Sequence, residues 1–348
     1  MIPRRRCGQH DLVLPALGMG CWAYGGGEYW GAQSQDDVDA VVRVAIEHGG
    51  NFFDTAEVYN DGGSERALGL ALRGLPRDSF ILGTKVSPSH TAAGTLEAHC
   101  EASLQRLGVE TIDLYMVHWP ITRKAIRHFT TDDIPIPSVE EAFAALMGLQ
   151  RAGKIRHIGV SNFSQARIDE ALATGATIVI NELPCSLLTR GIEADILPHC
   201  RDRGIGVLGY MSLLQGVLTD KWVQVGDIPV WQRRTRHFDS RRTPQCRHGL
   251  PGVEAETVAA VQRIRAIAVE LGLSTSALAL KWAMAVDGIT SSLCGSRNLR
   301  QFRDNLAAAE HPLDPAIIRI LNQATAPLQE ALGPGFDYYE HPDHDRTT

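Results

Sequence analysis

Residues 35–54 read Gln-Asp-Asp-Val-Asp-Ala-Val-Val-Arg-Val-Ala-Ile-Glu-His-Gly-Gly-Asn-Phe-Phe-Asp, a helical pattern joined by two glycines to a short apolar run. In the first part, apolar residues recur at Val38, Val41, Val42 and Ala45, which is the spacing of a helix with one buried face. The second part, Asn51–Asp54, is short, apolar on both faces and bounded by polar residues, as buried parallel strands are. This helix–strand unit indicates an α/β protein.

The same alternation recurs along the whole chain. The other candidate strands are Ala16–Cys21, Phe80–Val86, Ile112–His118, Ile155–Val160, Thr177–Ile180, Gly206–Tyr210 and Ile289–Cys294. Helical patterns lie between them, at Gln35–His48, Gly94–Leu107, Ile192–Arg203, Glu254–Leu271 and Asn298–Ala308, and Ser138–Glu141 forms a capping box that opens another helix. We therefore predict one (β/α)8 TIM barrel over residues 1–348, preceded by an N-terminal hairpin; an open doubly wound sheet is the alternative.

Three stretches do not fit the alternation of strands and helices: Pro120–Pro137, Met211–Gly252 and Gln323–Thr348. Within the last, residues 325–348 are taken as the C-terminal tail of the domain. Connections this long in a compact domain are commonly functional. We expect all three at the C-terminal face of the barrel, where barrel enzymes hold their active sites.

Composition excludes several classes of protein. A net charge of −6 argues against a nucleic-acid partner, which requires a basic surface. The seven cysteines are scattered and contain no C-x-x-C, so neither a disulfide framework nor structural zinc is expected. The 13 histidines contain no H-E-x-x-H and no dense cluster, and no metal site is predicted. No signal peptide or membrane span is recognised, so we expect a cytoplasmic protein whose oligomeric state stays open.

The segment Gly18-Met-Gly-Cys-Trp-Ala23 matches the dinucleotide pattern G-x-G-x-x-A and follows a candidate strand. That pattern binds a pyrophosphate only if a helix begins within the glycines. Here a glycine- and aromatic-rich segment, residues 24–31, follows, and the first helix begins near Gln35. We therefore interpret the segment as a loop at the barrel mouth.

Polar side chains stand where three neighbouring strands end. Asp54 closes one strand and precedes Tyr59, Lys85 lies at the end of the next, and His118 follows the third. Each alone has an ordinary structural explanation, but a buried Asp and Lys on one rim need each other as partners. The set suits carbonyl reduction, in which Tyr59 supplies a proton, Lys85 lowers the tyrosine pKa, and neutral His118 polarises the substrate oxygen.

At these residues the sequence strongly resembles the aldo-keto reductase superfamily, from about Leu12 to about Ala308. The resemblance is carried by Asn51-Phe-Phe-Asp-Thr-Ala-Glu-Val-Tyr59 with Ser64-Glu65, by Leu114-Tyr-Met-Val-His-Trp-Pro120, by Gly153-Lys-Ile-Arg-His-Ile-Gly-Val-Ser-Asn-Phe163 and by a segment after the last strand. It implies an enzyme that interconverts aldehydes or ketones and alcohols by hydride transfer, with Tyr59 as general acid/base supported by Asp54, Lys85 and His118.

The resemblance also implies a bound NADP(H). Its contacts would be made by Ser161, Asn162, Glu182, Tyr210, Ser212, Leu213, Gln215, Gly295, Ser296, Arg297, Gln301 and Asn305. A guanidinium suits the 2′-phosphate, which favours NADP(H) over NAD(H). Glu182 stands where the family usually has Gln, and a carboxylate should favour the oxidised, cationic nicotinamide. Ser212 and Cys185 also depart from the family pattern.

The substrate is not identified by the sequence. The rim aromatics Trp22, Tyr24, Trp30 and Trp119 suit a sugar, cyclitol or aryl carbonyl, although ordinary loop packing accounts for them equally well. The preferred direction of the reaction is also open. An alternative function is a cofactor-binding regulatory subunit similar to the β subunits of channels, and a more remote one is a phosphate-sugar isomerase barrel.

Overall fold

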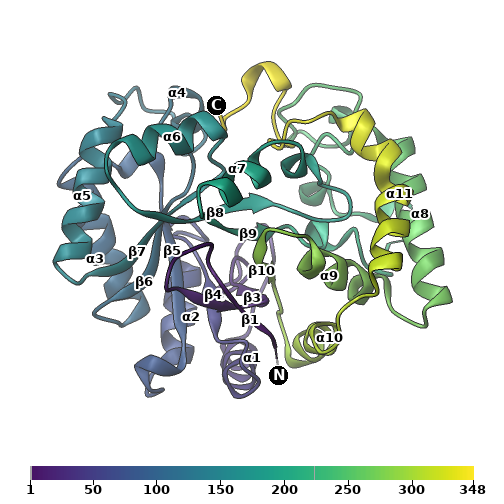
Figure 1. Ribbon diagram of the computed structural model, residues 1–348, viewed down its shortest axis with the longest axis horizontal. Helices are drawn as coiled ribbons and strands as arrows, with labels where there is room; N and C mark the ends of the chain where they lie inside the picture. The colour runs from purple at the N-terminus through teal and green to yellow at the C-terminus, as the bar shows by residue number, and fades with distance from the viewer. Residues whose placement is uncertain (1, 223) are drawn as a thin grey trace.

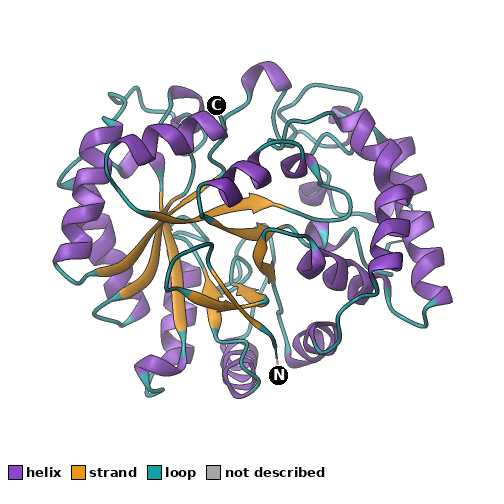
Figure 2. Ribbon diagram, in the orientation of Figure 1, coloured by secondary structure: helices purple, strands orange, loops and turns teal. Residues whose placement is uncertain are grey.

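The computed structural model describes residues 2–222 and 224–348, and eight parallel strands in it close into a barrel surrounded by helices (Figure 2). The strands are β3 (Leu17–Gly20), β4 (Phe52–Asp54), β5 (Ile81–Val86), β6 (Ile112–Val117), β7 (Ile155–Ser161), β8 (Ile178–Pro184), β9 (Gly206–Tyr210) and β10 (Ile289–Cys294). They pair in chain order, and β10 pairs with β3 to close the ring. The predicted barrel is confirmed and the open sheet is excluded.

The helices cover the outside of the barrel (Figure 1). They are α1 (Gln35–Glu47), α2 (Gly63–Leu72), α3 (Thr95–Leu107), α4 (Arg123–Ile126), α5 (Val139–Arg151), α6 (Gln165–Ala173), α7 (Ile196–Asp202), α8 (Glu254–Glu270), α9 (Thr275–Ala285), α10 (Leu299–Ala309) and α11 (Pro315–Leu332). The Ser138 hydroxyl accepts from the Glu141 amide, as its capping pattern predicts. Among the described residues no single helix is long and apolar enough to cross a bilayer. Helices α8 and α9 are together long and apolar enough, but they are bent by 98° at their junction.

An N-terminal hairpin precedes the barrel, as predicted. Strand β1 (Arg4–Arg6) pairs antiparallel with β2 (Val13–Pro15), and the Arg5 guanidinium donates to the carbonyl of Ile289 at the start of β10. A separate buried cluster joins the hairpin to the strands: Cys7, Leu12, Leu14, Phe52, Leu114, Met116, Val179, Ile180, Leu208 and Leu293. Because side chains fill the interior of such a barrel, an active site lies at its C-terminal face.

Three sequence-based boundaries were wrong. The helix expected from Ile192 begins at Ile196, after the 3-10 helix Gly191–Glu193. Strand β8 continues four residues past the predicted Ile180, because Asn181 and Glu182 are buried polar residues that an apolar-run criterion rejects. The helix ending near Ala308 is not the last, because α11 follows it and occupies the first part of the predicted tail. Asp314 caps α11 and Pro315 takes its first position, where proline is well tolerated. Helix α11 packs beside α8 (Figure 1).

The three long segments meet at the C-terminal face, as expected. Arg247, from the segment after β9, contacts His128 of the segment after β6 and forms a 2.7 Å ion pair with Glu340 of the tail. The tail is fastened by a buried ion pair, in which the Arg346 guanidinium meets both oxygens of Asp337 at 2.7 and 2.8 Å. The mouth of the barrel is therefore built from segments far apart in the sequence.

Candidate active site

Lys85 lies at the centre of a buried group of charges at the ends of β4 and β5. Its ammonium donates to both oxygens of Asp54, at 2.8 and 2.7 Å, and to the carbonyl of Thr55 at 2.9 Å. Adjacent parallel strands bring Asp54 and Lys85 to one edge of the sheet, and both side chains are almost fully buried. Burial opposes the charge of Lys85, but the Asp54 carboxylate outweighs it, so the pKa of the ammonium is raised and Lys85 stays protonated.

Tyr59 and His118 face the same point. The Tyr59 hydroxyl lies 3.4 Å from the Lys85 ammonium, and the rings of Tyr59 and His118 are edge to face with centroids 5.6 Å apart. Nδ1 of His118 is buried and has no hydrogen-bond partner among the described residues. The structure thus brings the four residues expected at the rim into one cluster with unused hydrogen-bonding capacity.

Glu182 supplies a second carboxylate to Lys85. Its Oε2 forms an ion pair with the Lys85 ammonium at 3.2 Å. Burial, followed by the charge of Asp54, raises the pKa of Glu182 to about 8. This direction favours the protonated form of Glu182, which the sequence-based expectation of an acceptor-only carboxylate did not include. A protonated carboxyl donates a hydrogen bond as an amide does.

Lys85 lowers the pKa of Tyr59, as expected, but it does not decide the net direction of the shift. Burial raises the pKa of the Tyr59 phenol above its ordinary value, and the opposing effect of the Lys85 ammonium does not outweigh it. The phenol therefore keeps its proton at neutral pH. Burial, Lys85 and His128 together hold the pKa of His118 well below its usual value, so His118 is neutral, as expected.

A hydrogen-bonded chain connects the ends of β7, β8 and β9. The Tyr210 hydroxyl donates to Oδ1 of Asn162 at 2.8 Å, and the Asn162 amide donates to the Ser161 hydroxyl at 2.9 Å. The Ser161 hydroxyl donates to the carbonyl of Glu182 at 3.2 Å. Asn162 has a φ of 62°, a conformation that costs energy for a side chain other than glycine and that often marks a functional site.

The segment after β9 is conformationally unusual. Met211, Leu214 and Gln215 all have positive φ, at 61°, 42° and 54°. Ser212 is buried and its hydroxyl donates to the carbonyl of Leu293 at 3.0 Å, whereas Leu213 and Gln215 are partly exposed. Gln215 accepts from the Tyr29 hydroxyl at 2.6 Å and donates to that of Tyr339 at 2.8 Å. Gln215 thus joins the segment after β9 to the loop of residues 24–31, which carries Tyr29, and to the tail, which carries Tyr339.

The segment between β10 and α10 carries the remaining predicted cofactor residues. Gly295 is exposed and Ser296 is buried, with its hydroxyl accepting from the Asn305 amide at 3.0 Å. The Arg297 guanidinium donates to Oε1 of Gln33 at 3.0 Å, and the Arg297 amide donates to Gln301 at 2.9 Å. These residues lie beside the N-terminus of α10, which favours anions.

Aromatic rings line the mouth. Trp22 lies against Tyr29, Trp30 and Tyr59 with centroids 4.8, 5.3 and 5.8 Å away. Tyr24 does not join them: it is 1% exposed within the hydrophobic core, so its predicted place at the rim is not supported. Trp119 is covered by the Arg346 guanidinium, 3.9 Å from its ring centroid. Sequence reasoning missed Arg346, because nothing local indicates that the tail returns to β6.

Residues 16–326 match the aldo/keto reductase family. The chain belongs to this family. A relative named NADH-specific methylglyoxal reductase, from Escherichia coli, is 30% identical over 342 residues, which cover 92% of this chain and 98% of the relative. The aldo-keto reductase YhdN of Bacillus subtilis is 32% identical over 291 residues, 81% of each chain.

Solved structures agree with this assignment. A glycerol dehydrogenase from Gluconobacter oxydans superimposes with a TM-score of 0.75 at 27% identity, over 93% of this chain and 95% of that one. An aldo/keto reductase from Klebsiella pneumoniae, solved in complex with NADP and acetate, gives 0.68 at 27% identity, over 92% and 95%. The family is thus one of oxidoreductases that use nicotinamide cofactors on small molecules.

Proposed function

We propose that this aldo-keto reductase interconverts small aldehydes or ketones and their alcohols, with Tyr59 as the group that exchanges a proton with the substrate oxygen. The observation that carries the proposal is the 3.4 Å approach of the Tyr59 hydroxyl to Lys85, whose ammonium is itself held by both oxygens of Asp54. Lys85 stabilises the tyrosinate that remains after proton donation. Neutral His118 has one N–H with which to hydrogen-bond the substrate oxygen.

The donor set fits a nicotinamide cofactor, which when bound supplies or accepts a hydride. Ser161, Asn162 and Glu182 offer buried hydrogen-bonding groups at the ends of β7 and β8, and Glu182 Oε2 lies 3.2 Å from Lys85. A carboxamide needs such groups. Tyr210 would support the nicotinamide ring, and Ser212, Leu213 and Gln215 would line the path of the phosphates. Gly295, Ser296, Arg297, Gln301 and Asn305 would hold the adenosine end.

NADP(H) is the cofactor we propose, since Arg297 and Ser296 lie next to the N-terminus of α10. Substituting Arg297 with Ala is expected to raise the KM for NADPH at least about tenfold, the loss of one charge-assisted contact, and to change that for NADH by less than about twofold. Steady-state kinetics with both cofactors measures this. An equal rise in KM for NADPH and NADH would show that Arg297 acts only by holding Gln33 and the loop before α1 in place.

The raised pKa of Glu182 predicts a cofactor preference that depends on pH. The neutral acid prevails below pH 8 and the carboxylate above it. The carboxylate attracts the oxidised, cationic nicotinamide, so between about pH 6.5 and about pH 9.5 the ratio of NADP⁺ to NADPH affinity should rise roughly tenfold. In Glu182→Gln the ratio should stay flat. Fluorescence titrations of wild type and variant test this, and parallel pH profiles for both would refute it.

Substrate class is tested by turnover. We expect NADPH consumption with at least one member of a panel of methylglyoxal, aryl aldehydes and sugars. Methylglyoxal is included because a relative is named a methylglyoxal reductase, and aryl aldehydes because the aromatic mouth around Trp22 and Trp30 suits flat carbonyl compounds. Trp119 lies deeper, beneath Arg346. Tight NADPH binding without turnover of any member of the panel would contradict the enzymatic proposal and favour a regulatory subunit.

A further inference from the structure

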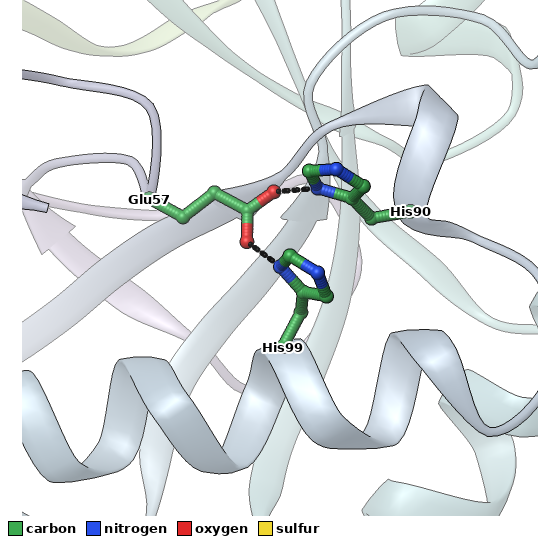
Figure 3. A group of neighbouring side chains, drawn as sticks. All are labelled: Glu57, His90 and His99. Atoms are coloured by element: carbon green, nitrogen blue, oxygen red, sulfur yellow. Dashed lines mark hydrogen bonds and ion pairs between the residues drawn. The ribbon is translucent and has the colours of Figure 1, made fainter. Parts of the chain in front are cut away.

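Three side chains with metal-ligating atoms converge outside the site described above. Glu57 lies in the loop after β4, His90 ends the short 3-10 helix Pro88–His90 after β5, and His99 lies in α3. Figure 3 shows the two histidine rings on one side of the Glu57 carboxylate, each with one nitrogen directed at it and the other directed away. The sequence predicted no metal site, since these residues are separated by 33 and 9 positions and match no known ligand spacing.

The geometry of the cluster is specific. Nδ1 of His90 lies 2.8 Å from one Glu57 oxygen, and Nδ1 of His99 lies 2.6 Å from the other. The two imidazole rings are stacked with centroids 3.9 Å apart and an interplanar angle of 20°. The Glu57 side chain is 5% exposed, whereas those of His90 and His99 are 36% and 33% exposed. The cluster is thus closed behind the carboxylate and open to solvent along the rings.

The ligating atoms already lie around one point. One Glu57 oxygen is 2.8 Å from the Ser87 amide and 2.8 Å from Nδ1 of His90, and the other is 2.6 Å from Nδ1 of His99. The three candidate ligand atoms all lie within 4.8 Å of one another, a span that one metal ion can bridge. A bound ion would replace the two contacts between imidazole and carboxylate by three metal–ligand bonds.

We propose that Glu57, His90 and His99 bind a divalent transition-metal ion of the zinc class. Two imidazole nitrogens and one carboxylate form a ligand set that zinc accepts, with solvent in the fourth position, whereas calcium and magnesium prefer oxygen ligands. Tetrahedral zinc needs neighbouring ligand atoms about 3.3 Å apart. The present separations of 2.8 and 2.6 Å are therefore short by about 0.5 and about 0.7 Å, and rotation of the partly exposed His90 and His99 side chains would lengthen them.

The ion would be structural. The Glu57 amide donates to the carbonyl of Lys85 at 3.2 Å, and its carboxylate accepts from the Ser87 amide at 2.8 Å. A metal bound here would tie the loop that carries Tyr59 to the end of β5 and to α3. Metal binding to the folded chain alone stabilises that chain by mass action.

Zinc binding to chelator-treated protein tests the proposal, with Zn²⁺ as the only added ligand. We expect one equivalent to bind with micromolar or tighter affinity by competition with a chromophoric chelator, and to raise the melting temperature. His90→Asn and His99→Asn should each weaken binding at least about tenfold, as loss of one of three ligands does. His48→Asn is the matched control, because His48 is exposed directly after α1 and its Nδ1 lies 2.9 Å from the carbonyl of Val44, away from the cluster.

Anomalous diffraction at the zinc edge locates the ion directly in wild-type crystals. A peak between Glu57, His90 and His99 is the expected result. Absence of zinc binding, a peak at other residues, or equal affinity in wild type, His90→Asn and His99→Asn would overturn the proposal and leave the cluster as a carboxylate satisfied by two imidazole N–H groups.

Discussion

Replacement of Tyr59 by phenylalanine is expected to lower kcat about a thousand-fold, within the range measured for loss of a general acid. The hydroxyl is the only group removed, and its neighbour Lys85 keeps Asp54 and the carbonyl of Thr55 as partners, so the fold and the cofactor site should be unchanged. NADPH affinity should therefore stay within about twofold of wild type. Absorbance of NADPH during turnover and fluorescence titration of the cofactor measure the two quantities.

Tyr115→Phe is the matched control for this experiment. Tyr115 is fully buried in β6, and its hydroxyl has no hydrogen-bond partner among the described residues, so its loss should leave kcat near the wild-type value. A Tyr59→Phe variant that retains more than about a tenth of wild-type kcat would refute Tyr59 as the proton donor.

Lys85→Met is expected to abolish turnover and also to destabilise the chain by about 3–5 kcal/mol, the cost of leaving buried charges without their partner. Asp54 and Glu182 would both lose their cation. Their pKa values are already raised by burial and would rise further. The folded chain then holds protons that the unfolded chain releases, so stability should fall as pH rises above the unfolded values of about 4. Denaturant unfolding at about pH 5 and about pH 8 measures this.

A double variant separates catalysis from stability. Lys85→Met with Asp54→Asn removes one of the two carboxylates that lack a cation in Lys85→Met, so it should recover part of the lost unfolding free energy. It should recover no turnover, because no cation remains to stabilise the tyrosinate. If the double variant regains activity, Lys85 supports the fold and not proton transfer. If Lys85→Met unfolds no more easily at the higher pH, its buried carboxylates keep nearly their unfolded pKa values, and the predicted rise of those pKa values is wrong.

Much of the site could be predicted from the sequence. Asp54, Lys85 and His118 follow recognisable strands, and consecutive parallel strands place their ends on one rim. The helix cap at Ser138 was also predicted, since a cap is a contact between residues three positions apart. These features depend on neighbours in the chain or on strand order alone.

Only the tertiary structure decided the protonation of Glu182, the burial of Tyr24 in the core, the return of Arg346 onto Trp119 and the meeting of Glu57 with His90 and His99. Periodicity reports which face of an element is buried, but it carries no information on which distant segment covers that face. A pKa depends on burial and on charges within a few ångströms, and those neighbours come from other strands and loops. The local sequence thus determined the barrel and the order of its polar strand ends, and long-range packing determined their charge states and their additional partners.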